Sequence, residues 1–122
     1  MATATATATI TQIDNTQKNV IAFGTIAISA ATDTYATNGI VLSGFLNDLI
    51  KTSSTSPNIV EITAMPAAGT SPSGWTYIYC YGTTLNNGKM AIFNGTTEFS
   101  NGAALTAPAA DVLVFRASFP RL

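Results

Sequence analysis

The residues that could carry out chemistry are few and far apart in this chain of 122 residues. Histidine is absent, which removes the commonest general base and the commonest transition-metal ligand. Serine and cysteine nucleophiles therefore lack their usual histidine partner. The acidic residues are spread along the whole chain, and no two are closer than thirteen positions: Asp14, Asp33, Asp48, Glu61, Glu98 and Asp111.

These carboxylates fit structural roles better than catalysis. Folding could bring two of them together for acid–base work, but no spacing in the sequence favours such a pair. Asp33 and Asp111 precede expected strands, where Asp commonly accepts hydrogen bonds from nearby backbone N–H groups. The sequence has neither the spaced acidic loop that binds calcium nor a Gly-rich phosphate loop. We therefore expect a protein that is not an enzyme and that uses no cofactor and no metal.

The chain is poor in charge but rich in apolar residues. Charged residues make up 9% of it, against roughly 25% in an average globular protein, and hydrophobic residues make up 47%. A core can form, and the surface must be largely uncharged, which favours lasting contacts with other subunits. A nucleic-acid partner is not expected, because the basic residues are scattered rather than clustered: Lys18, Lys51, Lys89, Arg116 and Arg121.

An aromatic residue at every second position is the strongest pattern in the sequence: Trp75, Tyr77, Tyr79 and Tyr81. This aromatic row predicts a strand, and a polar connector ending in Asn87-Gly88 leads to a second strand over residues 89–93. Asn-Gly suits the bend because both residues tolerate positive φ. The row either packs in a core or subunit contact, or forms an exposed strip that stacks on sugars. Cys80, the only cysteine, is expected to be a small buried residue of this strand.

The N-terminal segment repeats Ala-Thr with a period of two. As a strand it would carry its alanines on one face and, on the other, Thr3, Thr5, Thr7 and Thr9. Such small side chains bury little area, so the segment would dock through its backbone by adding to a sheet edge of a neighbouring subunit. The alternative is a frayed chain end. We interpret residues 1–15 as an extended arm, with Thr3, Thr5, Thr7, Thr9 and Ile10 as interaction residues, and residues 16–122 as the domain.

The remaining chain alternates short apolar runs with turns. Residues 20–29 are apolar on both faces, and Gly24 among them indicates a bulge or a close backbone approach. Residues 59–64 and 111–119 also predict strands, the last with one apolar face formed by Leu113, Phe115, Ala117 and Phe119. The only plausible helix is Ser43–Lys51, for which the alternative is a strand that ends in a bend, and polar loops follow at residues 52–58 and 65–73.

Together these segments predict an all-β protein. Six to eight short strands at close spacing are typical of a single β-sandwich or small barrel domain, here jelly-roll-like with the N-terminal arm attached. No apolar run approaches the length needed to cross a bilayer, and Met1 is followed by no secretory signal pattern, so we expect synthesis in a reducing cytoplasm and no membrane partner. The sequon Asn94-Gly95-Thr96 is then only a turn.

Several segments together resemble the small decoration, or cement, proteins of tailed double-stranded DNA bacteriophage heads. The likeness covers most of residues 20–122, and the segments that carry it are FGTIAI at 23–28, YATNGI at 35–40, YIYCY at 77–81, GKMAIF at 88–93 and DVLVFRASF at 111–119. The resemblance implies a homotrimer that sits near threefold positions on the outer surface of the virion. There it would tie neighbouring copies of the major capsid protein together.

Two functions remain open at this point. The first is a structural decoration protein that stabilises the capsid. The alternative is a phage tail, fibre or baseplate component with a carbohydrate-binding β-sandwich, in which Trp75, Tyr77 and Tyr79 would contact the glycan.

Overall fold

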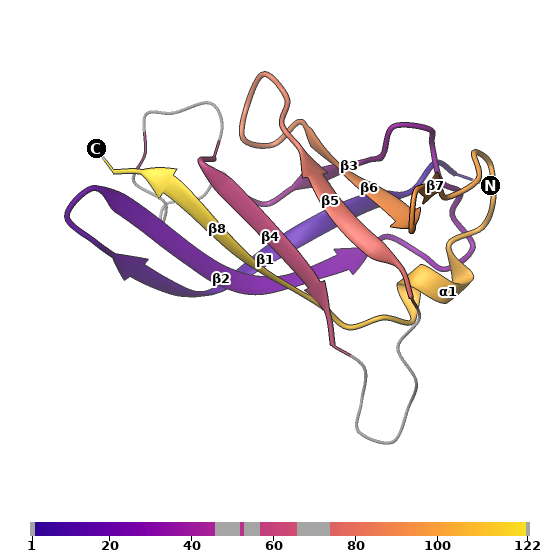
Figure 1. Cartoon of the computed structure of the whole chain (residues 1–122), viewed down its shortest axis with the longest axis horizontal. Coiled ribbons are helices and arrows are strands. Elements are labelled where there is room, and N and C mark those ends of the chain that lie inside the picture. Colours follow the sequence, from indigo (N-terminus) through magenta and orange to yellow (C-terminus); the bar gives the residue numbers. More distant parts are fainter. Residues whose placement is uncertain (1, 46–51, 53–56, 66–73, 122) are drawn as a thin grey trace.

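A computed structural model describes residues 2–45, 52, 57–65 and 74–121 (Figure 1). Nearly all the regular structure is β. One helical turn, α1 (Thr106–Ala109), precedes the last strand. The strands are β1 (Thr5–Asn15), β2 (Asn19–Ile28), β3 (Ile40–Ser43), β4 (Ile59–Ala64), β5 (Thr76–Cys80), β6 (Gly88–Asn94), β7 (Thr97–Glu98) and β8 (Leu113–Pro120).

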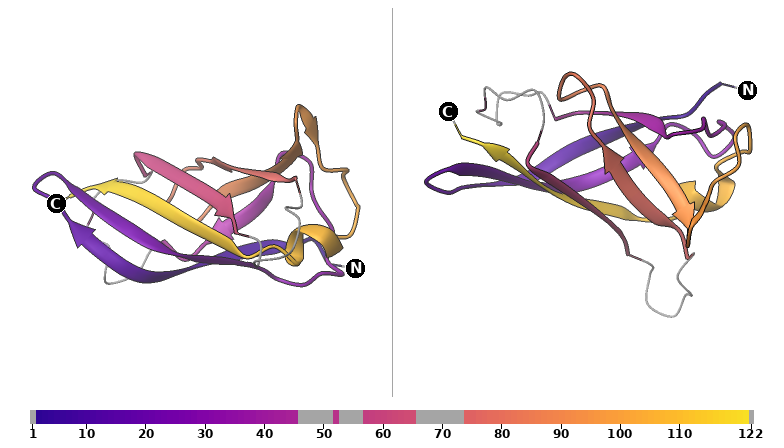
Figure 2. Two further views of the ribbon diagram at one scale, coloured as in Figure 1. Left: turned by 60° about the horizontal axis from the view of Figure 1, so that its bottom comes forward. Right: turned by 45° about the horizontal axis from the view of Figure 1, so that its top comes forward.

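The strands form one sheet that curls into a nearly closed barrel. Its order is β4-β8-β2-β1-β3-β6-β5, and β7 adds a short hairpin to β6. All neighbouring pairs are antiparallel except β1 and β3. The two edge strands, β4 and β5, lie side by side in Figures 1 and 2, although no ladder joins them within the described residues. The prediction of a single all-β domain is confirmed, in its barrel form.

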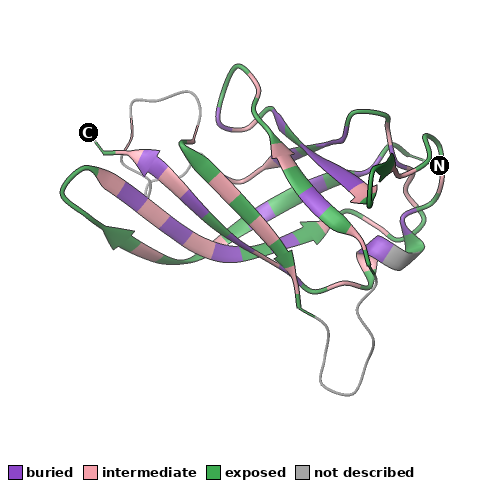
Figure 3. Ribbon diagram, viewed as in Figure 1, coloured by how far each residue is buried: buried purple, intermediate pink, exposed green. Residues whose placement is uncertain are grey.

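The core fills the inside of this barrel, because side chains alternate in and out along each strand (Figure 3). The predicted apolar face of β8 is confirmed, since Leu113, Phe115, Ala117 and Phe119 are all buried. Phe45, just after β3, is fully buried among other aromatic rings. Its ring centroid lies 5.4 Å from that of Phe115, 5.7 Å from Phe119 and 6.0 Å from Tyr79, all edge to face. Such pairs stabilise a core beyond the area they bury.

The N-terminal segment is a central strand, so its prediction as a projecting arm is wrong. Most of it forms β1, which pairs with β2 on one side and β3 on the other. It is extended with alanines on one face, as predicted, but Ala4, Ala6 and Ala8 are buried in the chain's own core. Sequence reasoning counted only the small area of these side chains. Backbone pairing on both edges holds the strand, and the short methyl groups leave interior space for large rings.

Gly24 marks a close backbone approach and a bulge, as predicted. The register between β1 and β2 shifts between Ile10 and Gln12, so Thr11 is an extra residue opposite Gly24. A Cβ atom at Gly24 would overlap the carbonyl oxygen of Thr9. Only glycine lets the two strands approach at this point, and the bulge strengthens the local twist that helps a sheet to curl.

The β5–β6 hairpin is present, but its turn differs from the one predicted. The chain reverses over residues 81–87, and Gly88 already begins β6 without a left-handed φ. Asn87 caps the connector instead, accepting a 2.8 Å hydrogen bond from the N–H of Thr84 at its Oδ1. Gly88 is required because a Cβ there would overlap the phenol of Tyr79. The next hairpin, β6–β7, turns at the sequon as predicted, with Gly95 at φ 65°.

The predicted helix at Ser43–Lys51 does not begin where expected. Ser43 ends β3, and Gly44 after it has φ 106°, a left-handed conformation that an α-helix excludes. The rest of that prediction, and most of the two polar loops at 52–58 and 65–73, lies outside the described residues. Sequence reasoning missed α1, a single turn over Thr106–Ala109 that contains Pro108.

Candidate functional site

The threonine row lies on the outside of the barrel. Thr3, Thr5, Thr7 and Thr9 are exposed. Across the strands, Thr7 lies beside Ala27 and Ser43, and Thr9 lies beside Thr25. Ile10 does not join this row. It is half-buried and packs against the core, so it points away from the proposed contact surface.

The outer side of β2, β8 and β4 continues this surface. Two rows of outward residues cross these three strands. One row is Thr25, Val114 and Thr63, and the other is Phe23, Arg116 and Glu61. We call the combined surface the neutral face. Its outward side chains are Thr5, Thr7 and Thr9 of β1, Phe23, Thr25 and Ala27 of β2, Val112, Val114 and Arg116 in and just before β8, and Glu61, Thr63 and Met65 in and just after β4.

The neutral face carries one pair of opposite charges. Arg116 Nη2 donates to Glu61 Oε1 across β8 and β4. Both side chains are more than half exposed, so the pair adds little to stability, but it cancels the net charge of the face. Asp14, the next charge along β1, lies beyond the bulge at Thr11.

Apolar groups are exposed on the same face. Met65 is 50% exposed and Val112 is 54% exposed, and the two are joined by a 2.8 Å backbone hydrogen bond from the Met65 N–H to the Val112 carbonyl. Phe23 and Val114 are half-buried. A groove of about 450 Å³ is lined by Phe23, Met65 and Val114, with Thr11 and Arg116 also in its wall. The neutral face is thus grooved, apolar in part and rich in hydroxyl groups, which suits contact with another protein surface.

The aromatic row faces the interior, unlike a sugar-stacking strip. Tyr77 is buried and its hydroxyl donates a 2.5 Å hydrogen bond to Asp111 Oδ2. Tyr79 packs edge to face against Phe45, and burial raises the pKa of its phenol. Its buried hydroxyl has no hydrogen-bond partner among the described residues. Tyr81, just after β5, is 79% exposed.

Cys80 occupies the opposite side of β5 from this row, and its prediction as a buried residue is wrong. The thiol is exposed because Cys80 shares its side of the strand with Ile78, which is itself 46% exposed. Across the ladder it pairs with Lys89 of β6, which in turn lies beside Val41 of β3. Val41, Ile78, Cys80 and Lys89 form a second, smaller exposed surface, which we call the β3–β6–β5 face.

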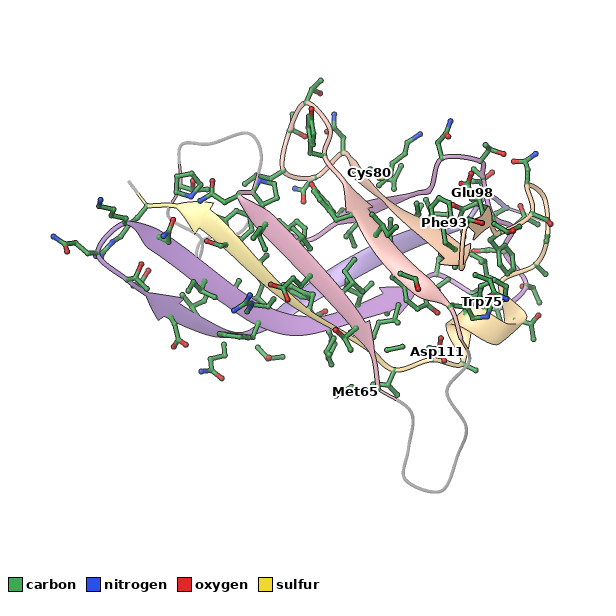
Figure 4. All side chains as sticks on the ribbon, in the orientation of Figure 1. Met65, Trp75, Cys80, Phe93, Glu98 and Asp111 are labelled. Atoms are coloured by element: carbon green, nitrogen blue, oxygen red, sulfur yellow. The ribbon has the colours of Figure 1, made fainter. Side chains whose placement is uncertain are left out.

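Trp75 stands at one end of the aromatic row, beside a pocket of about 400 Å³ (Figure 4). Its ring centroid is 4.9 Å from that of Phe99, with an interplanar angle of 65°. The wall of the pocket also contains Asn94, Thr97, Glu98, Ser100 and Ala103. Sequence reasoning singled out Trp75 but missed the others, because they come from the β6–β7 hairpin and the segment after it.

Glu98 is held in place by a buried tyrosine. Its Oε2 accepts a 2.6 Å hydrogen bond from the Tyr35 hydroxyl and a 2.7 Å bond from the backbone N–H of Asn38. The same hydroxyl accepts a 3.2 Å bond from the N–H of Ile92. Burial, and then the bond to Glu98, raise the pKa of Tyr35 to about 12. This network ties β7 to the connection between β2 and β3.

Three other described carboxylates also have side-chain partners. Asp33 accepts a 2.6 Å bond from the Ser29 hydroxyl, Glu61 pairs with Arg116, and Asp111 accepts from Tyr77. Asp33 and Asp111 thus each accept a hydrogen bond from a side-chain hydroxyl. No cluster of three or more potential metal ligands occurs in the part of the chain that the structure describes.

Comparison with known proteins gives no relative. The chain matches no protein-family model, no curated protein and no solved structure. Within the described ranges, no helix has the length and apolar character that a membrane crossing requires. The function is therefore argued from the surfaces of the barrel itself.

Proposed function

We propose that the protein is a capsid decoration protein of a tailed double-stranded DNA bacteriophage. It binds the outer surface of the head as a homotrimer and stabilises the lattice of the major capsid protein. The observation that carries this proposal is the neutral face, on which exposed apolar groups and threonine hydroxyls surround one pair of opposite charges, Arg116 and Glu61. The resemblance to phage cement proteins in residues 20–122 supports the same function.

The composition of the neutral face suits permanent adhesion. Burying an ionised side chain without a partner is costly, whereas hydroxyl groups can be buried when they find hydrogen-bond partners. The exposed threonines supply donors and acceptors, while Met65 and Val112 supply apolar area. A specific contact buries roughly 1,200–2,000 Å² in total, so the shell contact would centre on this face and extend beyond it.

A decoration protein must contact both its own copies and the shell. The β3–β6–β5 face gives a second surface for this purpose, with Val41 and Ile78 more than two-fifths exposed. Its strands lie on the other side of β1 from β2, β8 and β4, and it adjoins the neutral face where Val41 pairs with Thr5. We assign the neutral face to the shell and the β3–β6–β5 face to the trimer.

Stabilisation then follows from mass action. A protein that binds the closed lattice but not separated subunits shifts the equilibrium toward the intact shell. At a free concentration of one hundred times Kd, each filled site contributes about 2.7 kcal/mol. Packed DNA pushing outward would be resisted by these added lateral bonds. No chemical step and no cofactor are needed for this function.

Particles with and without the protein test the proposal. Heads that carry it should withstand heating and osmotic shock better, as measured by the release of DNA. Thr25→Glu introduces a charge in the middle of the neutral face and should abolish both binding and protection. Thr96→Glu makes the same change in the β6–β7 turn, outside the neutral face, and should leave both intact. Equal leakage with and without the protein would refute the function.

The alternative of a carbohydrate-binding tail or fibre component is less well supported. It calls for an exposed strip formed by Trp75, Tyr77 and Tyr79, but Tyr77 is buried and Tyr79 packs against the core. Trp75 borders a surface pocket, but at one end of the row and not as part of a strip.

A further inference from the structure

The pocket beside Trp75 has the composition of a small polar ligand site. It opens between the start of β5, the β6–β7 hairpin and the segment 99–103, and its volume of about 400 Å³ lies within the usual range of small-molecule pockets. One wall is aromatic, formed by Trp75 and Phe99. The remaining wall is polar, with the amide of Asn94, the hydroxyls of Thr97 and Ser100, and the carboxylate of Glu98.

We propose that this pocket binds an uncharged pyranose sugar. A pyranose ring has one face of C–H groups, which pack on an aromatic surface, and a rim of hydroxyls, which need both donors and acceptors. The indole ring of Trp75 and the phenyl ring of Phe99 supply the aromatic surface. Asn94 supplies a donor and an acceptor on one rigid amide, and Glu98 supplies acceptors only.

Glu98 is positioned for this role before any ligand arrives. Both of its described hydrogen bonds, from Tyr35 and from Asn38, go to Oε2. Oε1 receives none from the described part of the chain, so it remains available to accept from a sugar hydroxyl. Because two donors fix the carboxylate, little side-chain entropy is lost on binding. A hydrogen bond to a charged acceptor is also stronger than one between neutral groups.

The same carboxylate sets the specificity. Among the described residues of the pocket wall, Glu98 is the only charged one. An anionic sugar such as a uronic acid would bring a like charge close to it, which costs affinity. The ligand class is therefore neutral hexoses and N-acetylhexosamines.

This site is separate from the surfaces assigned to the capsid. None of its lining residues belongs to the neutral face or to the β3–β6–β5 face. A protein bound to a shell through the neutral face could thus still bind sugar at this end of the barrel. The proposal goes beyond lattice stabilisation, and it stands or fails independently of it.

The chain has a single tryptophan, so its fluorescence reports on this pocket alone. The full-length protein is titrated with methyl β-glucoside, methyl β-galactoside, methyl α-mannoside and methyl β-N-acetylglucosaminide, with methyl β-glucuronide as the anionic comparison. At least one neutral glycoside should give a saturable change with Kd in the millimolar range, and the glucuronide should bind at least tenfold more weakly. Absence of saturation with all four neutral glycosides, or equal binding of the glucuronide, overturns the proposal.

Three variants test whether the sugar binds in this pocket. Asn94→Ala, at the exposed end of β6, should weaken binding about three- to tenfold. Glu98→Gln keeps an acceptor for Tyr35 and Asn38 but removes the charge, so it should bring glucuronide affinity within about threefold of the neutral sugar. Tyr81→Ala removes an exposed aromatic residue outside the pocket and should change nothing. Binding that survives Asn94→Ala unchanged, or that Tyr81→Ala weakens equally, overturns the assignment.

Discussion

A buried acid in β1 would show whether the Ala-Thr segment is an internal strand. Ala6 is 1% exposed and faces the core, whereas Thr7, the next residue, is exposed on the outer side. We expect Ala6→Asp to destabilise the protein severely and Thr7→Asp to have almost no effect. If the segment were a projecting arm, neither substitution would change stability.

The size of the effect follows from the burial of residue 6. Full burial raises the pKa of an Asp carboxyl by about 3–5 units from its usual value of about 3.9, so the carboxyl is largely neutral in the folded state at pH 7. The penalty at pH 7 is then set by the distance of about 3 units between that pH and the unfolded-state pKa, which at 1.36 kcal/mol per unit is about 4 kcal/mol. This is a large share of the roughly 5–15 kcal/mol that stabilises an ordinary domain. The sign of the pH dependence is fixed as well. A raised folded-state pKa makes the variant relatively more stable as the pH falls toward 4, where the carboxyl begins to be protonated in the unfolded state as well.

Thermal and urea unfolding of Ala6→Asp, Thr7→Asp and the wild type at pH 7 and pH 4 measures this directly. The expected result is a loss of several kcal/mol for Ala6→Asp at pH 7, a smaller loss at pH 4, and a change below about 0.5 kcal/mol for Thr7→Asp. Equal unfolding midpoints for the two variants would refute the assignment of β1 to the core.

Three further predictions concern other parts of the barrel. Tyr35→Phe should cost about 1–3 kcal/mol, because it leaves buried groups without their hydroxyl partner. Since the pKa of Tyr35 is raised to about 12, its stabilising contribution is complete below pH 10 and is lost as the pH rises through 12. Urea unfolding between pH 8 and pH 12 should therefore show a loss of stability in the wild type. The loss over the same range should be smaller in Tyr35→Phe. Gly24→Ala should cost about 2–4 kcal/mol in urea unfolding, because the new Cβ meets the Thr9 carbonyl, and a neutral outcome would contradict the close strand approach. In the dissociated monomer, Cys80 should react with a thiol reagent at the rate of an unfolded control peptide, and protection in the monomer would contradict its exposure; the assembled trimer should react more slowly, because the β3–β6–β5 face is then covered.

The fold class and several strands followed from local patterns. Alternation alone placed the buried face of β8 and the strand that carries Tyr77, because a strand turns successive side chains to opposite sides. Gly24 was recognised as a close approach, since a glycine within an apolar strand has few other uses.

The errors have one physical cause, which is that strand partners are set by tertiary structure. Period two fixed which residues of the Ala-Thr segment share a face, but not that both of its edges pair inside the chain. Cys80 was assigned to the interior from its residue type, although the aromatic row had already taken that side of β5. Glu98 and Trp75 are far apart in the sequence, so their common pocket could be found only from the structure.

Electron cryomicroscopy of phage heads mixed with the purified protein would show whether the protein binds the shell through the neutral face. We expect trimeric density on the outside of the shell near threefold positions, with the outer sides of β1, β2, β8 and β4 against the major capsid protein. Heads that remain bare at saturating protein concentration, or density in which this face points to solvent, would contradict it.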